Sequence, residues 1–222
     1  MENRNIFIIT STINTNIGNI HSGTRFEETV KTINSIRTKD RNAIILLIDN
    51  STIRIDTRFE EYIASMVDFY LYIGDRSICR EFNKAGIRSA GEAYILLVAI
   101  EIIRTKITGN INRIFKLSGR YNLTNEFDIS EYAGDLYKGK YCFRQNDSQD
   151  DKCYHTRLWS FCYSLIDEAT ILIHNSLKMI FKNQINIEEC FFTLIDKEMI
   201  TLKEKIHCEG FPALWHNVHI SE

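Results

Sequence analysis

The sequence predicts an α/β fold, in which a single domain has a mostly parallel open sheet flanked by helices. Residues 6–13 (IFIITSTI) have the β-branched and aromatic composition of a strand, and residues 43–48 (AIILLI) are an apolar run typical of a strand buried on both faces. Between them, apolar residues recur at helical spacing from Phe26 to Ile36. This strand–helix–strand order is a βαβ unit, which favours a parallel sheet.

The rest of the chain continues the pattern without a repeat, a low-complexity tract or a linker, so we expect one domain over residues 1–222. Capping-box spacing, Thr57 with Glu60 and Ser89 with Glu92, marks the start of two further helices. The expected strands are 69–74, 112–118 and 140–144, and the expected helices are 57–66, 89–103, 156–181 and a short one from residue 187. From residue 203 the tail predicts a strand and a turn.

The composition argues against several classes of protein. The 222 residues carry a formal net charge of −2, so no overall basic field favours a nucleic-acid partner or an anionic membrane. The first residues lack the apolar stretch of a signal peptide, and no apolar run approaches the ~20 residues of a transmembrane span. The six cysteines include no Cys-x-x-Cys pair, which is typical of reduced core residues. We expect a soluble, cytoplasmic protein.

Several motifs that carry chemistry are absent. The sequence has no Gly-rich phosphate loop of the P-loop or dinucleotide type, no His-Glu-x-x-His and no Gly-x-Ser-x-Gly. Two pairs, His216 with His219 and Cys153 with His155, are too sparse to predict a zinc site. We therefore predict no metal ligands from these residues.

Polar side chains follow the carboxyl ends of the predicted strands, where open parallel sheets bind their ligands. These residues are Thr10, Ser11 and Thr12, then Asp49, Asn50 and Ser51, then residues 74–76, and finally Lys116, Ser118, Gly119, Arg120 and Tyr121. Asp49 has the chemistry to accept a hydrogen bond from a ribose or a base, although Asp-Asn-Ser is also ordinary turn chemistry. Lys116 and Arg120 suit a pyrophosphate, and a turn with two solvated cations is the alternative.

The order of IFIITSTI, RFEETVKTINSI and AIILLIDNS resembles the opening of GT-A-type, nucleotide-sugar-dependent glycosyltransferases. GEAYILLVAIEII followed by RIFKLSGRYNL resembles the next segment of that family, in which a helix precedes the strand that normally ends in an Asp-x-Asp metal motif. The resemblance covers roughly residues 5–125, with a weaker match in YHTRLWSF and NIEECFF. It implies a nucleotide-binding half over about 1–125 and an acceptor-side half over about 126–222.

One departure from the family concerns the metal. No Asp-x-Asp occurs in this chain, and KLSGRY stands where the family would place it. Lys116 and Arg120 are expected to substitute for a divalent ion at the diphosphate, or else to lie against an acceptor sugar with Tyr121 stacked on its ring. A Mn²⁺ or Mg²⁺ ion stays an open alternative, and the acidic loop NDSQDD is its candidate ligand set, although a solvated loop is favoured.

An inverting transferase also needs a general base that takes the proton from the acceptor hydroxyl. Glu188 is the first candidate, and Asp128 and His155 are its rivals, whereas Glu189 fits a capping pattern with Asn186. Two arginines complete the set of candidate site residues. Arg157, with Thr156, is expected at the start of the long helix, where it would contact phosphate or acceptor, and Arg25 at the start of the first helix faces either the nucleotide or solvent.

The resemblance implies a glycosyltransferase whose partners are a nucleotide-sugar donor and a glycan or lipid-linked acceptor. A nucleotidyltransferase is one alternative, but the loop after the first strand lacks the lysine usual in that class. A non-catalytic domain that binds carbohydrate or another protein is a second alternative, since loss of the metal motif is what a degenerate enzyme would show.

Overall fold

The computed structural model describes residues 3–14, 22–145, 152–211 and 219–221. Its main feature is a seven-stranded, mostly parallel sheet in the order β3-β2-β1-β4-β7-β6-β8, which confirms the predicted fold class. The strands are β1 (Arg4–Ser11), β2 (Ile44–Asp49), β3 (Phe69–Tyr72), β4 (Ile111–Ser118), β6 (Tyr141–Arg144), β7 (Leu158–Cys162) and β8 (Ile200–Lys203). Among them, β7 runs antiparallel to its neighbours β4 and β6.

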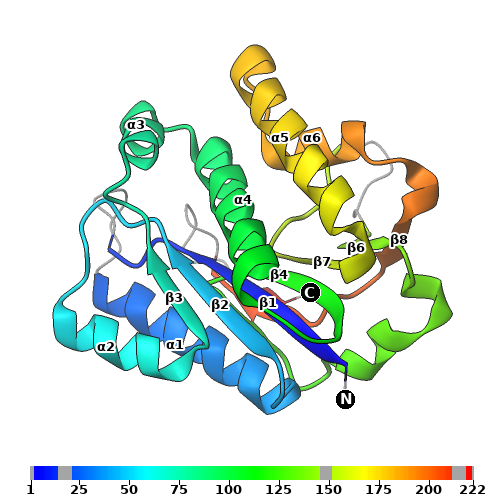
Figure 1. The fold of residues 1–222 in the computed structure, drawn as a ribbon, viewed down its shortest axis with the longest axis horizontal. Helices are drawn as coiled ribbons and strands as arrows, with labels where there is room; N and C mark the ends of the chain where they lie inside the picture. The colour runs from blue at the N-terminus through cyan, green and yellow to red at the C-terminus, as the bar shows by residue number, and fades with distance from the viewer. Residues whose placement is uncertain (1–2, 15–21, 146–151, 212–218, 222) are drawn as a thin grey trace.

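Helices cover both faces of this sheet (Figure 1). One face packs against α1 (Ser22–Lys39) and α2 (Thr57–Met66), and the other against α3 (Ser77–Ala85), α4 (Arg88–Lys106), α5 (Ile166–Asn183) and α6 (Ile187–Leu194). Short 3-10 helices η1 (Ile129–Ala133), η2 (Asp135–Tyr137), η3 (Tyr163–Leu165) and η4 (Lys197–Met199) lie in the connections. A small sheet of β5 (Tyr121–Leu123), β9 (Cys208–Gly210) and β10 (Ile220–Ser221) lies on the α1 side, in the order β10-β9-β5.

Side-chain alternation along the strands divides the interior into two cores. In β1, Ile6 and Ile8 face α4, whereas Phe7 and Ile9 face α1. Phe7 stacks on Phe115 of the adjacent β4, with ring centroids 4.7 Å apart. Every residue of β2 is buried, as expected for a parallel strand covered by helices on both faces.

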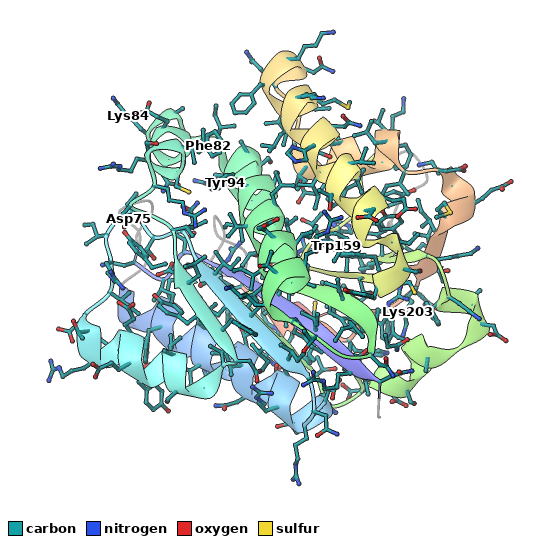
Figure 2. The ribbon with its side chains drawn as sticks, viewed as in Figure 1. Asp75, Phe82, Lys84, Tyr94, Trp159 and Lys203 are labelled. Carbon is teal, nitrogen blue, oxygen red and sulfur yellow. The ribbon has the colours of Figure 1, made fainter. Side chains whose placement is uncertain are left out.

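Most predicted elements are confirmed with small shifts of their ends, but the long helix expected over 156–181 is wrong in its first part. Residues 158–162 form β7, and the helix α5 begins only at Ile166. Trp159 pairs with Lys116 in the register of β7 and β4, and it lies beneath α5 in the middle of the molecule (Figure 2). The open side of β4 offers backbone hydrogen bonds to a partner strand, and this tertiary contact overrides the local helical spacing.

The capping signals have mixed outcomes. Asn186 is the N-cap of α6, as predicted, and its side chain accepts a hydrogen bond from the backbone of Glu189. Helix α2 begins at Thr57, but its cap is Asp56. Ser89 lies inside α4 and caps nothing, which frees Glu92 from the capping role expected of it.

No helix in the described parts of the chain combines the length and the apolar character that crossing a bilayer requires.

A close backbone approach joins the loops that follow β2 and β3. A Cβ atom added at Gly74 would lie 1.8 Å from the carbonyl oxygen of Ser51. Since both partners are backbone near the sheet edge, neither can move without displacing the strand ends. Glycine is therefore required at this position for steric reasons.

We predict that Gly74→Ala destabilises the protein by at least about 2 kcal/mol, because overpacking forces the two loops apart. Urea denaturation measures the change in the free energy of unfolding. The control is Gly23→Ala on α1, where an added Cβ would meet nothing within 4 Å. Equal stability of the two variants would contradict the steric account.

Candidate functional site

Asp49 fixes the loops at the ends of β1 and β2. Its Oδ1 accepts hydrogen bonds from the backbone N–H of Ile13 (3.2 Å), from the backbone N–H of Ser51 (3.0 Å) and from the hydroxyl of Ser51. Its Oδ2 is buried and has no hydrogen-bond partner among the described residues. Burial raises the pKa of Asp49 to about 6, and the hydrogen bonds from Ser51 and Ile13 oppose that rise.

Asn50 and Ser51 connect this loop to its surroundings. The hydroxyl of Ser51 accepts a hydrogen bond from the backbone N–H of Asn14, at 2.7 Å. The backbone carbonyl of Asn50 accepts a hydrogen bond from the side chain of Asn83 on α3, at 3.3 Å. The side-chain Oδ1 of Asn50 is buried and has no partner among the described residues. The start of α4 is close, since a Cβ at Gly91 would lie 3.2 Å from Nδ2 of Asn50.

The turn after β4 lies close to β1 and α1. The backbone N–H of Gly119 donates to the carbonyl of Thr10 at 2.9 Å, and the hydroxyl of Thr29 on α1 donates to the carbonyl of Gly119 at 3.2 Å. A Cβ at Gly119 would lie 2.9 Å from Oγ of Ser11, so a larger residue would displace this turn. Thr12, by contrast, is exposed.

Two guanidinium groups lie against Tyr121, and the charge of a third is close to one of them. The first two belong to Arg120, in the turn before β5, and to Arg157, on the segment before β7, and each lies 5.9 Å from the centre of the ring. Arg25 of α1 is only 5% exposed and pairs with Glu28 at 3.0 Å. Burial and the nearby charge of Arg25 both lower the pKa of Arg120. Nη1 of Arg120 is buried with no hydrogen-bond partner among the described residues, so this group is suited to receive an anion.

A second cluster lies on the opposite face of β4. Lys116 points away from Phe115 and Leu117, as the alternation predicts, but it is only 1% exposed. Its Nζ donates to the hydroxyl of Ser118 (2.9 Å) and the carbonyl of Thr156 (2.7 Å), and it forms an ion pair with Glu92 of α4. Two N–H donors of this ammonium are hydrogen-bonded to the protein and its charge is paired with Glu92, so Lys116 is engaged within the protein interior.

Glu188, at the first turn of α6, joins this cluster. Its Oε1 accepts a hydrogen bond from the hydroxyl of Thr156 at 2.7 Å. Burial and the carboxylate of Glu92 raise the pKa of Glu188, and Lys116 opposes that rise. A carboxyl group with a raised pKa, close to a second carboxylate and a lysine, has the chemistry of a general base.

The other predicted site residues are placed as follows. Asp128 is exposed and is the N-cap of η1. The positive charge of Lys39, the last residue of α1, lies near its carboxylate. From Arg25 to Lys39 the helix rises about 21 Å, so Asp128 lies far from the guanidinium cluster. His155 lies half-buried in the segment before β7. Arg157 precedes a strand, so the expectation that it binds phosphate through a helix N-terminus is wrong.

Sequence reasoning missed Glu92, because the spacing of Ser89 and Glu92 suggested a helix cap. The signal that could have identified it is an acidic residue in an otherwise apolar helix that precedes the strand carrying Lys116. Its side chain is 26% exposed, so it is the solvent-accessible member of its ion pair.

Among the described residues, no three His, Cys, Asp or Glu side chains are grouped so as to hold a metal ion. The acidic loop NDSQDD and His216 lie outside those residues. Arg120 lies in the turn after β4, where the resemblance would place the Asp-x-Asp motif.

The chain has the GT-A-type glycosyltransferase fold. The glycosyltransferase GlyE of Streptococcus pneumoniae is similar over 91% of this chain and 46% of that chain, so this chain spans under half of GlyE (TM-score 0.56, 11% identity). Mouse xyloside xylosyltransferase 1 is similar over 90% and 85% (TM-score 0.50, 8% identity).

The 4-diphosphocytidyl-2C-methyl-D-erythritol synthase of Anaerococcus prevotii shares the fold over 90% of this chain and 86% of that chain (TM-score 0.53, 12% identity). No family model and no curated protein matches the sequence. At these identities the likeness establishes the fold, and the activity has to be argued from the site.

We predict that Asp49→Asn changes how stability depends on pH. The folded-state pKa is raised, so the wild-type carboxyl binds its proton more tightly when folded and loses stability as pH rises from about 4 to about 7. The variant lacks this titration. Its free energy of unfolding minus that of the wild type should therefore rise by on the order of 2 kcal/mol across that range.

Urea denaturation at several pH values between those limits measures this difference. Asp135→Asn, in exposed η2, controls for loss of one carboxylate elsewhere. A difference that stays constant from acid to neutral pH would contradict the raised pKa of Asp49.

Proposed function

We propose that this chain is a glycosyltransferase that moves a sugar from a nucleotide-sugar donor to a glycan or lipid-linked acceptor. The observation that carries the proposal is the arrangement at the end of β4. There, the guanidinium groups of Arg120 and Arg157 lie against Tyr121 on one side of the sheet, with the charge of Arg25 close to Arg120, and a buried carboxylate–lysine cluster lies on the other side. Arg120 also lies within electrostatic range of Glu92, a member of that cluster.

The nucleoside is assigned to the ends of β1 and β2. Asp49 and Asn50 each hold a buried oxygen without a partner among the described residues, and buried polar atoms are rarely left unpaired. Such oxygens can accept from the N–H of a base or the hydroxyl of a ribose. Thr10, Ser11 and Thr12 border the same edge, and β1 fixes the backbone of the first two.

The diphosphate is assigned to Arg120 together with Arg25 and Arg157. One guanidinium group can donate two parallel hydrogen bonds to the oxygens of a phosphate, and it stays charged in a partly buried site. Lys116 has a positioning role in this scheme, because its donors hold Ser118, Thr156 and Glu92. This assignment keeps the idea of a cationic substitute for the Asp-x-Asp motif but moves it from Lys116 to the arginines.

The reaction is a displacement at the anomeric carbon of the donor sugar. Glu188 takes the proton from the acceptor hydroxyl, and the freed oxygen forms the new bond to the anomeric carbon. The bond from that carbon to the diphosphate breaks, and the diphosphate leaves with the electron pair, stabilised by the guanidinium charges. The described residues offer no metal-ligand set, so no step is assigned to a metal.

The first test is a thermal-shift panel of nucleoside diphosphates and nucleotide sugars, each with and without Mn²⁺. A ligand at a hundred times its Kd should stabilise the protein by about 2.7 kcal/mol. We predict a shift for one nucleotide class without metal, and its loss in Arg120→Ala. Arg41→Ala, an exposed arginine before β2, is the matched control and should keep the shift.

Other outcomes contradict parts of the proposal. A shift that needs Mn²⁺ would exclude the metal-free scheme, and unchanged donor binding by Arg120→Ala would exclude its phosphate role. Release of pyrophosphate in place of a nucleoside diphosphate would identify a nucleotidyltransferase. No shift with any nucleotide would favour a non-catalytic domain.

We predict that Glu188→Gln retains donor binding but loses turnover by about 10²–10⁴-fold, because the amide cannot take a proton. In the wild type, activity should fall as pH decreases through the raised pKa of Glu188, since only the ionised form is a base. The measurement is the pH dependence of kcat/KM. Glu189→Gln, on the same helix turn, is the control, and a similar loss in both variants would exclude Glu188 as the base.

A further inference from the structure

A polar groove of about 600 Å³ runs between α1 and the small sheet. One wall is the outer side of α1, with the exposed residues Glu27, Lys31 and Asn34. The other wall is formed by β5 and β9, and Arg120 lines the groove next to β5. Since Arg120 also belongs to the guanidinium cluster, the groove and the candidate site share this residue.

The wall formed by the small sheet is built with fixed geometry. Asn122 and Glu209 are opposite each other across β5 and β9, and the side-chain amide of Asn122 donates to Glu209 Oε1 at 3.0 Å. A Cβ at Gly210 would lie 2.2 Å from the carbonyl oxygen of Arg120, so only glycine permits this close pairing. The amide and the carboxylate are therefore held in place before any ligand arrives.

An aromatic pair lies near the end of the same wall. Phe211 and His219 have ring centroids 5.2 Å apart, and both line the groove. Phe211 is 38% exposed, so part of its ring is open to contact. A ring of this kind offers an apolar face against which the C–H groups of a sugar can pack.

The lining excludes two classes of ligand. Among the described lining residues, the carboxylates of Glu27, Glu28 and Glu209 are matched by Lys31, Arg120 and the Arg25 that pairs with Glu28, so the groove has no excess of positive charge to attract a polyanion. The many polar groups disfavour an apolar peptide or an acyl chain, because their desolvation would be left uncompensated. A neutral polyol fits, since its hydroxyls both donate to carboxylates and accept from amides.

We propose that this groove binds a neutral oligosaccharide and directs its terminal hydroxyl toward Arg120. The role of that saccharide as acceptor rests on the proposed function, whereas the class of ligand rests on the groove alone. A hydroxyl at the Arg120 end would lie beside the diphosphate assigned to the same guanidinium. The groove then sets the acceptor class, and the edge of the main sheet sets the donor.

The test uses saturation-transfer NMR of the full chain with maltotetraose, cellotetraose, chitotetraose and, as the anionic comparison, tetragalacturonate. Asn34→Trp places a large ring in the groove from an exposed helix position. Thr38→Trp, one turn further on α1 and outside the groove lining, is the matched control. Asn122→Ala removes the amide without filling the space. Thermal denaturation establishes that each variant is folded.

At least one neutral oligosaccharide should bind the wild type and Thr38→Trp, and bind Asn34→Trp at least about tenfold more weakly, with Asn122→Ala also weakened. The thermal shift by nucleoside diphosphate should be the same in all four proteins. Binding of tetragalacturonate alone, absence of any neutral binding, or equal binding by Asn34→Trp would each overturn the proposal. Saccharide binding without any nucleotide shift would support the groove and remove the proposed transferase function.

Discussion

The buried ammonium of Lys116 is the constraint on which the organisation of this protein depends. A charge in the middle of a sheet is tolerated only when it is paired and hydrogen-bonded. Glu92 on α4, the carbonyl of Thr156 before β7 and the hydroxyl of Ser118 at the end of β4 supply these partners. Thr156 in turn donates to Glu188 on α6. One lysine thus connects a central strand, two helices and the start of the antiparallel strand at the point where ligands of such sheets bind.

The same arrangement separates two electrostatic environments by the thickness of a single strand. Positive charge collects around Tyr121 on the α1 side, and it is suited to a leaving diphosphate. On the α4 side, burial and the neighbouring carboxylate of Glu92 raise the pKa of Glu188. Lys116 points from β4 to the α4 side of the sheet, whereas Tyr121 belongs to the core on the α1 side. An acid–base reaction next to an anionic leaving group requires a base and cations that are close together but do not pair with each other.

Sequence reasoning found the elements whose signals are local. The apolar run of β2, the helix after Asp56 and the Asn186 cap of α6 depend on neighbouring residues only. It failed where partners come from distant segments. β7 is a strand because β4 lies beside it, and the pairing of Lys116 with Glu92 requires the packing of α4 on the sheet. The convergence of polar strand ends was predictable from topology and the side taken by Lys116 from the alternation in β4, but the burial of Lys116 against Glu92 was not.

The antiparallel direction of β7 limits the insertions and deletions that the chain can accept just before this strand. Because β7 runs against β4, its beginning lies at the edge where the other strands end, and the residues before it enter the site. The carbonyl of Arg157 accepts a hydrogen bond from Ser118, which ties the last of these residues to the sheet. Removing one residue here would exchange the inward and outward sides of β7, moving Trp159 out of its core and Arg157 away from Tyr121. Insertions and deletions at this point therefore disturb the fold of the protein itself, before any separate effect on activity arises.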